Sequence, residues 1–300
     1  MKKLSFFILI AFSSFFIGCS TDENGISSER EAELDKEASL KSAGASGIDI
    51  LSNNIFTKLR IEIAYVDGFR PTEEAVEGLV SYLKEHTFKE EIELIYTALE
   101  SPDEESLSLN EIAELEAENR TVYNEGDTLG IYIYFSDAPA EGDDEDAELV
   151  TLGAVYRNTS MIIHEVTVKK LANRSFLITD ADVENSTLNH EFGHLFGLVN
   201  LGTAPINDHE GTTTDDDGNT VGNSHCSVDG CLMQAELTFG SSNGKTARTP
   251  SSENKDELTS ACNLTGKDVL RMLEAKTSKG LGPASLDAEC ILDLQSVGGR

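Results

Sequence analysis

Apolar and polar residues follow a regular order between residues 51 and 199, and this order predicts alternating strands and helices. Period-two alternation and compact apolar runs predict strands at 59–66, 91–99, 129–135, 151–164 and 166–171. The last two of these strands are expected near a cleft. Apolar residues at helical spacing predict helices at 71–86, 110–120 and about 181–198. This alternation favours an α/β (α+β) fold around a mixed, mostly parallel sheet.

The pattern weakens beyond residue 200. Gly, Thr, Asn and Asp dominate 201–224, and Gly, Ser, Thr and Asn dominate 239–252, so both segments are expected to be loops. Short helices are predicted at 265–275 and 286–294. We therefore expect one domain at 51–300, with an N-terminal subdomain at 51–199 and a loop-rich C-terminal subdomain at 200–300.

The N-terminus has the features of a bacterial lipoprotein signal. Lys2 and Lys3 precede an apolar run from residue 4 to 17, which is shorter than the ~20 residues of a membrane span. Gly18-Cys19 resembles the end of a lipobox, so we expect a signal peptide at 1–18 and an acylated Cys19. The polar stretch 19–50 is predicted to be a disordered tether. These features predict an outer-membrane lipoprotein of the cell envelope, and the acidic start of the tether leaves surface exposure open.

The charge of the chain excludes one class of partner. With 54 acidic and 23 basic residues, its formal charge is −31, and such a surface repels phosphate backbones. We therefore expect no nucleic-acid partner. The acidic turn 215–219 leaves a calcium site open, although its spacing does not match an EF-hand loop, and a solvated turn is the favoured interpretation.

The cysteine content agrees with export. Five cysteines are present, and acylation of Cys19 leaves four, enough for two disulfides in an oxidising compartment. Three pairings are possible, of which we favour Cys226–Cys231 with Cys262–Cys290. Zinc binding by cysteines is the alternative, but the spacing lacks the paired CxxC pattern of a structural zinc site.

One short motif carries the chemistry. His190 and His194 enclose Glu191 in an HExxH pattern, with Gly197 three residues further on. Histidines at i and i+4 share a helix face and can hold one Zn²⁺, and the glutamate is placed to act on a metal-bound water. An amphipathic helix with two ordinary histidines is the competing interpretation. It is disfavoured because the glutamate, the glycine and the apolar stripe occur together. The stripe consists of Phe192, Leu195, Phe196 and Val199, and both histidines fall beside it.

The start of the motif helix is also marked. Thr179 and Asp180 follow an apolar run and can cap a helix that begins near Ala181.

A catalytic zinc needs a third protein ligand. The motif resembles that of the metzincins, HExxHxxGxxH, but Asn200 stands where that family has its third histidine. His225-Cys226, followed by Cys231 and Met233, resembles the HC-x4-C-x-M segment of the archaemetzincins. That resemblance implies His225 as third ligand and Met233 as the Met-turn residue. His209 and Asn200 remain alternative ligands.

The resemblance extends to archaemetzincin-like bacterial lipoprotein metalloproteases. It is carried by HEFGHLFGLVNLGT, the HC…CLM segment and the residues at 286–290. It implies a metzincin-like catalytic domain with one catalytic zinc. The family can use such cysteines for a structural zinc. The later CxxC is absent here, however, so a disulfide that fixes His225 is the favoured interpretation.

These observations predict a membrane-anchored zinc endopeptidase in which Glu191 assists the attack of water on a peptide bond. We expect a protein or peptide substrate that pairs with an edge strand within 153–164, and a monomeric enzyme. His164 is a possible additional cleft residue, although an ordinary strand histidine is favoured. The alternative function is a non-catalytic surface binding lipoprotein with a degenerate or structural zinc site.

Overall fold

The computed structural model describes residues 36–143, 150–215, 217–234 and 284–300, together with 258, 270, 273–274 and 277–278. They belong to one compact unit that runs from Asp35 to Arg300. The expected signal peptide, Cys19, Cys262, the loop at 239–252 and most of the helix predicted at 265–275 lie outside the described residues. Within the described residues, no helix has both the length and the apolarity that a membrane span requires.

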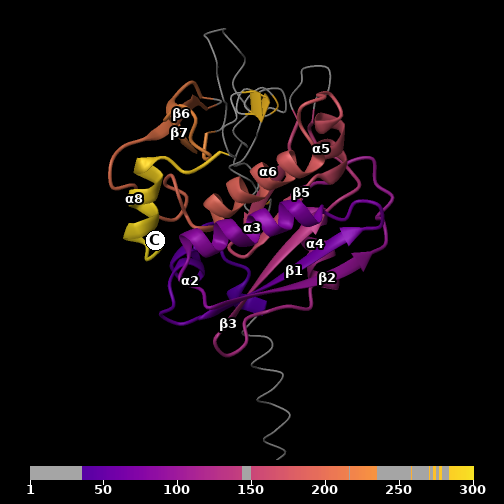
Figure 1. The fold of residues 1–300 in the computed structure, drawn as a ribbon, viewed down its shortest axis with the longest axis horizontal. Coiled ribbons are helices and arrows are strands. Elements are labelled where there is room, and N and C mark those ends of the chain that lie inside the picture. The colour runs from indigo at the N-terminus through magenta and orange to yellow at the C-terminus, as the bar shows by residue number, and fades with distance from the viewer. Residues whose placement is uncertain are drawn as a thin grey trace, which may run out of the picture. The chain divides into compact units, whose positions relative to one another are not determined.

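A five-stranded sheet lies at the centre, with the order β2-β1-β3-β5-β4 (Figure 1). Its strands are β1 (Lys58–Val66), β2 (Glu91–Leu99), β3 (Thr128–Phe135), β4 (Gly153–Arg157) and β5 (Ser160–Ile163). The first four strands in this spatial order are parallel, and β4 is antiparallel to β5 at one edge. The predicted mixed, mostly parallel sheet is therefore confirmed.

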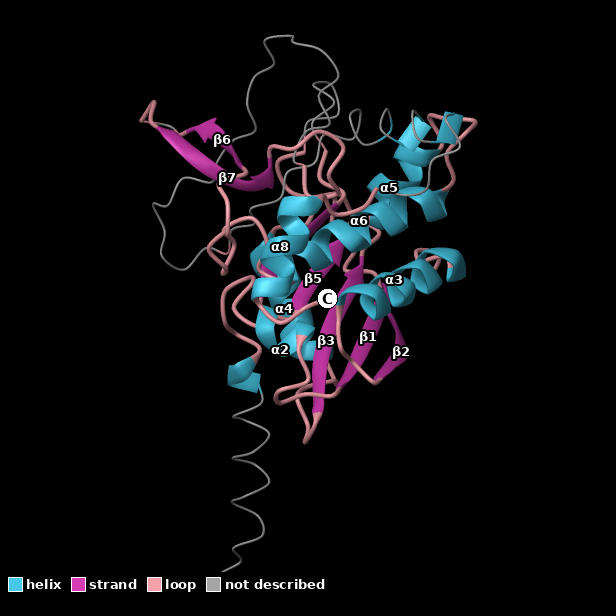
Figure 2. Cartoon of the chain, turned by 60° about the vertical axis from the view of Figure 1, so that its left-hand side comes forward, coloured by secondary structure: helices cyan, strands magenta, loops and turns pink. Residues whose placement is uncertain are grey.

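Helices cover both faces of this sheet. Helices α3 (Glu73–His86) and α6 (Asp180–Leu195) lie side by side over one face (Figures 1 and 2). Helix α5 (Glu165–Ala172) packs against α6, and α4 (Leu109–Asn119) covers the opposite face. Alternate residues of each strand enter the two cores, as Ile131 and Tyr132 of β3 do.

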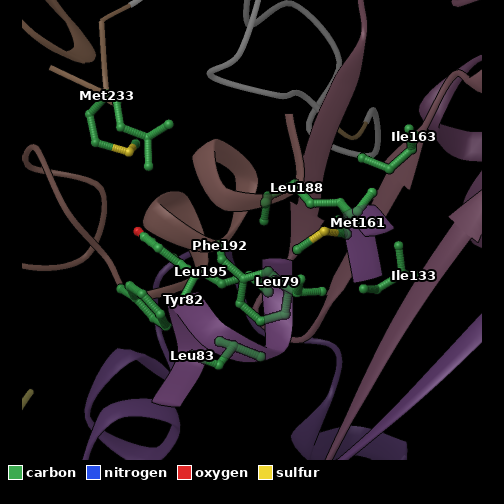
Figure 3. Close-up of a cluster of buried hydrophobic side chains, with 14 of the residues drawn as sticks. Leu79, Tyr82, Leu83, Ile133, Met161, Ile163, Leu188, Phe192, Leu195 and Met233 are labelled. Atoms are coloured by element: carbon green, nitrogen blue, oxygen red, sulfur yellow. The ribbon is translucent and has the colours of Figure 1, made fainter. Parts of the chain in front are cut away.

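The core between the sheet and α6 is apolar and closely packed. Leu188 and Phe192 of α6 lie with Leu79 of α3 and Met161 of β5, all with no exposed surface (Figure 3). Burial of such side chains stabilises a fold by about 1.5–3 kcal/mol each. This packing fixes the rotation of α6 about its axis, and hence the direction in which its polar residues point.

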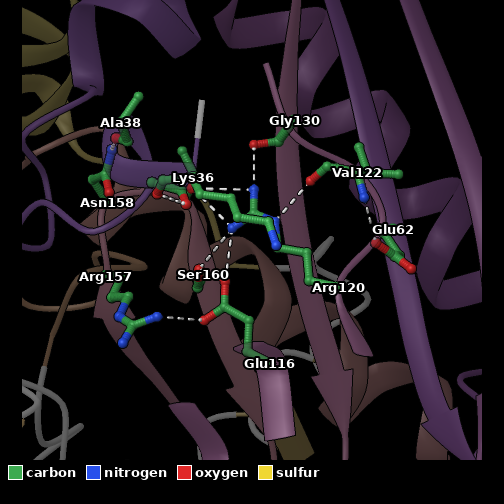
Figure 4. Close-up of polar contacts among 12 residues, drawn as sticks. Lys36, Ala38, Glu62, Glu116, Arg120, Val122, Gly130, Arg157, Asn158 and Ser160 are labelled. Carbon is green, nitrogen blue, oxygen red and sulfur yellow. Dashed lines mark hydrogen bonds and ion pairs between the residues drawn. The ribbon is translucent and has the colours of Figure 1, made fainter. Parts of the chain in front are cut away.

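A buried polar cluster joins α4 to the opposite face of the sheet (Figure 4). Arg120, which ends α4, donates to Glu116 at 2.7 Å and to the Gly130 carbonyl at 3.0 Å. Glu116 also accepts from Ser160 at 2.6 Å and from Arg157 at 3.3 Å. Because each charged group has several partners, the cluster holds three strands and a helix in one register.

Two segments differ from the sequence prediction. The strand predicted at 166–171 is wrong, because Glu165–Ala172 forms helix α5; Val168 and Leu171 bury one helical face against α6. The loop predicted at 201–224 contains a hairpin of β6 (Glu210–Thr214) and β7 (Thr220–Cys226). Its strands are polar and largely exposed, so they lack the apolar alternation that identifies a strand. The helix predicted at 286–294 is confirmed as α8 (Ala288–Ser296).

Part of the segment that was expected to be a disordered tether is folded. Helix α2 (Gly47–Leu51) buries Ile50 and Leu51 completely in the main core. Asn158, in the β4–β5 turn, binds this region by donating to Ala38 O at 2.9 Å and to Ser46 Oγ at 2.8 Å. The described residues from 36 onward are therefore part of the folded domain.

Two buried carboxyl groups lie where α5 meets α6. Glu165 and Glu184 both have no exposed surface, and Glu184 accepts hydrogen bonds from the backbone and hydroxyl of Thr72. Lys169 lies 2.9 Å from Glu165 and 3.6 Å from Asp180. Burial, and then the neighbouring Glu184, raise the pKa of Glu165 to about 9. Glu165 is therefore protonated in the folded protein at neutral pH.

We expect Glu165→Gln to stabilise the protein at pH 8. Between pH 4.5 and about 9, unfolding releases a proton from Glu165, so the free energy of unfolding falls as the pH rises through this window. Glutamine removes this dependence. Urea denaturation at several pH values measures it, with the exposed Glu114→Gln as control. An equal pH slope in wild type and Glu165→Gln would contradict the assignment.

Candidate metal centre

Helix α6 begins at a complete capping box. Thr179 accepts from the Asp182 backbone at 3.2 Å, and Asp182 accepts from the Thr179 backbone at 2.8 Å. Thr179 is therefore the cap that the sequence predicts, and the helix begins at Asp180. The box fixes the first turn, and the apolar core fixes the remainder, so the HExxH residues in the last turns have one orientation.

The structure brings three histidines together. His190 and His194 from α6 meet His225 from β7, and their ligand atoms all lie within 4.8 Å of one another. The Nε2 atoms of His190 and His194 are 3.1 Å apart. Two nitrogens bound to one tetrahedral zinc at ordinary bond lengths are about 3.3 Å apart. The arrangement therefore has the dimensions of a three-nitrogen metal site.

Neighbouring carbonyls orient two of the rings. His190 Nδ1 lies 2.7 Å from the Leu232 carbonyl, and His225 Nδ1 lies 2.7 Å from the Asn223 carbonyl. A carbonyl accepts only, so both Nδ1 atoms carry the proton and both Nε2 atoms present a lone pair. His225 Nε2 is buried and has no hydrogen-bond partner among the described residues. Such an atom fits a metal ligand, because a buried nitrogen without a partner is costly.

Burial keeps the three rings neutral. Burial, together with the nearby His225, lowers the pKa of His190 to about 3, and burial lowers the pKa of His225 to about 4. Burial also places the pKa of His194 well below its usual range. A neutral imidazole is the form that binds a metal, so the site is ready for one at neutral pH.

Glu191 lies beside this site, next to the edge strand. Its side chain has no exposed surface. A Cβ atom built on Gly153, the first residue of β4, would lie 3.0 Å from Glu191 Cγ and 2.9 Å from Thr187 Cγ2. The strand backbone therefore passes close to the glutamate, and only glycine allows this approach without displacing a side chain.

Met233 packs directly on the motif helix (Figure 3). A Cβ atom built on Gly193 would lie 2.1 Å from Met233 Sδ, so the sulfur occupies the space that Gly193 leaves open. Gly193 and Met233 are both buried. Met233 therefore packs against the helix that carries His190 and His194, and its role as the Met-turn residue stays a prediction.

The predicted Cys226–Cys231 disulfide is wrong, and the Cys262–Cys290 pairing cannot be compared because Cys262 lies outside the described residues. Cys226, Cys231 and Cys290 are free and buried, and the Cys231 and Cys290 sulfurs are 3.6 Å apart. Backbone pairing of Leu232 N with Ser285 O at 2.9 Å places the start of α8 beside the His225–Met233 segment. Cys290 therefore points at Cys226 and Cys231, whereas Cys262 lies outside the described residues.

His209 completes this second group. Its Nδ1 lies 3.4 Å from Cys226 Sγ, while its Nε2 lies 2.8 Å from a carboxylate oxygen of buried Asp293. His209, Cys226, Asp287 and Cys290 have ligand atoms within 4.8 Å of one another. Hydrogen bonds from Cys231 and Cys290 lower the pKa of Cys226, which favours its thiolate. We name these five residues the thiol group: His209, Cys226, Cys231, Asp287 and Cys290.

The other candidate residues have different partners. His209 belongs to the thiol group and not to the three histidines, and the amide of the exposed Asn200 donates to Glu210 at 3.0 Å. His164 lies 2.9 Å from the Ala138 carbonyl and is buried, as expected for an ordinary histidine.

In the acidic turn, Asp215 accepts from Asn219 N at 2.7 Å and from Asp217 N at 3.1 Å, so this carboxylate caps its own turn. The described part of the turn does not support calcium.

Sequence reasoning did not find the thiol group or Gly153. The members of the thiol group are separated by up to 81 positions, from His209 to Cys290, and no fixed spacing relates them. The only sequence feature that could have indicated the thiol group is a set of cysteines that lacks the paired CxxC pattern.

Comparisons with known proteins identify no family for this chain. No protein-family model matches, and no curated protein matches. Among solved structures, an archaemetzincin from Methanopyrus kandleri is similar, with a TM-score of 0.45 and 13% sequence identity. The similarity covers 80% of this chain and 96% of that one. This similarity is too weak to assign a function, so we infer the function from the site geometry.

We expect the metal-free protein to lose stability as the pH falls from about 6.5 to about 4. In this window the unfolded imidazoles take up protons, whereas His190 and His225 in the folded protein do not. Urea denaturation with a chelator present measures the effect. The double variant His190→Gln/His225→Gln removes two of the titrating groups, so its slope against pH should be smaller. An unchanged slope would contradict the pKa assignment.

Proposed function

We propose that this chain is a zinc-dependent endopeptidase whose metal is held by His190, His194 and His225. The observation that carries the proposal is the meeting of three buried, neutral imidazoles beside Glu191, which follows His190 directly in the chain. Three histidines leave a fourth position of a tetrahedral zinc for water or substrate, which is typical of catalytic zinc sites. A structural site has no use for the adjacent carboxylate.

The residues of the chain divide the chemistry between them. Zinc in this site supplies a Lewis acid that polarises the scissile carbonyl and makes a water molecule more acidic. The Glu191 carboxylate accepts the proton of the attacking water and returns it to the leaving amine. The carbonyls of Leu232 and Asn223 keep His190 and His225 in the tautomer that binds metal.

We infer that an extended peptide binds along β4. This strand lies at the edge of the sheet, and its first residue, Gly153, passes beside Glu191. A peptide that adds to an edge strand forms main-chain hydrogen bonds, so its backbone would run past the glutamate. A protein or peptide is therefore the substrate class that the geometry favours.

We also propose that the protein is a monomeric lipoprotein of the cell envelope, anchored through Cys19. The support is the sequence of the first 23 residues, in which a basic start and an apolar run precede Gly18-Cys19 and an acidic stretch. Lipid attachment at Cys19 would leave the folded domain, which is described from residue 36, outside the membrane.

We expect Glu191→Ala to abolish hydrolysis of an unfolded protein while the zinc content stays at the wild-type value. Loss of a general base typically costs 10²- to 10⁴-fold in rate. Metal analysis and cleavage assays on the full chain test this, with the exposed Glu77→Ala of α3 as a matched control. Equal cleavage rates in wild type and Glu191→Ala, with zinc bound in both, would instead support a non-catalytic binding protein with a structural zinc.

A second zinc in the thiol group is the interpretation that its chemistry favours. Cys226 and Cys290 offer two sulfurs, His209 one nitrogen and Asp287 one carboxylate oxygen, with these ligand atoms within 4.8 Å of one another, and each of these atom types binds zinc. Asp293 binds the far nitrogen of His209, as carboxylates do behind histidine ligands. The ion would join Cys226 of β7, His209 before β6 and the start of helix α8, and would protect the bound thiols from oxidation.

We expect wild type to contain two zinc ions per chain and Cys290→Ser to contain one. The variant should unfold at a lower temperature, because the thiol group joins α8 to the rest of the domain. Metal analysis and thermal unfolding measure both effects, and Ser227→Ala, an exposed position beside the group, is the control. The same zinc content in wild type and Cys290→Ser would contradict this assignment.

A further inference from the structure

The hairpin that carries His225 is irregular just before that residue. Thr212 pairs with Gly222, but the next pair joins Glu210 to Cys226. Three residues of β7 therefore stand opposite Gly211 alone, which is a bulge. Ser224 lies at its centre, with a φ of 56° in the left-handed region. A bulge bends its strand and redirects side chains, so its geometry decides where the following residue, His225, points.

One carboxylate holds this bulge. The N–H group of Ser224 has no strand carbonyl opposite it, and Glu210 Oε1 accepts its hydrogen bond at 2.8 Å. Glu210 Oε2 accepts from the Asn200 amide at 3.0 Å. The same side chain thus binds the residue that precedes His225 and the loop that follows helix α6. Hydrogen bonds to an ionised carboxylate are stronger than neutral ones.

The chain leaves space for this carboxylate. A Cβ atom built on Gly222 would lie 2.3 Å from Glu210 Oε1 and 2.5 Å from its Cδ. Any side chain at position 222 would therefore displace the carboxylate from Ser224. The hydrogen bond from Ser224 to Glu210 therefore depends on Gly222, which lies on the opposite strand of the hairpin and leaves space for the carboxylate.

Short contacts link the bulge to the imidazole. His225 N donates to Asn223 Oδ1 at 3.1 Å, and His225 Nδ1 donates to the Asn223 carbonyl at 2.7 Å. Both contacts come from the bulge itself, on the residue before Ser224. A change in the bulge therefore moves the Asn223 carbonyl and, with it, the His225 ring.

We propose that Glu210 is the positioning residue for His225, and that Asn200 acts through Glu210 rather than as a metal ligand. The inference rests on the proposed zinc site. Asn200 follows the motif helix closely, and its amide connects that helix to the hairpin through the Glu210 carboxylate. Two histidines on α6 and a third on a separate hairpin form one site only if the hairpin is held at a fixed distance from the helix.

The test measures the affinity of the three-histidine site for cobalt in the full chain. Co²⁺ bound by nitrogen shows weak ligand-field bands, whereas Co²⁺ in the thiol group shows intense thiolate charge-transfer bands, so the two sites are read separately. We expect Glu210→Ala to weaken cobalt binding at the histidines by about 10- to 100-fold, the range for residues that orient metal ligands. Gly222→Ala should weaken binding in the same direction, because its Cβ displaces the carboxylate.

Two variants separate positioning from hairpin stability. Glu210→Gln keeps an oxygen for Ser224 N–H, and its amide nitrogen can donate to Asn200 Oδ1 once the Asn200 amide turns over, so it should retain nearly the wild-type affinity even if Glu210→Ala folds poorly. Asp215→Ala removes the carboxylate that caps the turn of the same hairpin, at the end away from His225, and should leave the affinity unchanged.

Equal cobalt affinity in wild type and Glu210→Ala would overturn the positioning role, as would equal losses in Asp215→Ala and Glu210→Ala. Absence of cobalt from the three histidines of wild type would instead overturn the proposed metal site itself, and the positioning role with it. Thermal unfolding of each metal-free variant shows whether a loss of affinity reflects a loss of fold.

Discussion

Helix α6 is buried along nearly its whole length, although many of its side chains are polar. A buried polar atom without a partner is costly, so each of these side chains must find one. Glu184 binds Thr72, Thr187 binds the Val183 carbonyl, and His190 binds the Leu232 carbonyl. A metal ion bound by the three histidines would meet the same requirement. The residues packed around α6 therefore supply the hydrogen-bond partners that its buried polar side chains need.

The segment from His225 to Met233 supplies much of that set. Its first residue joins the histidines of α6, its last packs on Gly193, and Leu232 O orients His190. Cys226 and Cys231 belong to the thiol group, so the segment takes part in both groups. Cys290 of α8 and His209 before β6 fix the thiol side. Anything that binds the thiol group thereby limits the movement of the residues that surround the histidines.

The sequence predicts the sheet well because its strands and helices bury one face each, and such faces leave a periodic pattern at positions such as Ile61, Ile63 and Leu79. It also predicts the meeting of His190, His194 and His225, because the motif spacing is local and the His225 segment has its own signature. It does not predict the polar hairpin at 210–226, which has no apolar period. The sequence also does not predict that the free thiols lie close together, because tertiary contacts bring them together. An even number of cysteines says nothing about the distances between them.

We propose that His190, His194 and His225 form the catalytic metal centre. Anomalous diffraction at the zinc absorption edge, from crystals of the protein grown with zinc, tests it most directly. The account predicts an anomalous peak between the three Nε2 atoms, at about 2.0–2.1 Å from each, with an oxygen in the fourth position. A structure in which these imidazoles bind no metal, while zinc occupies only the thiol group, would contradict it.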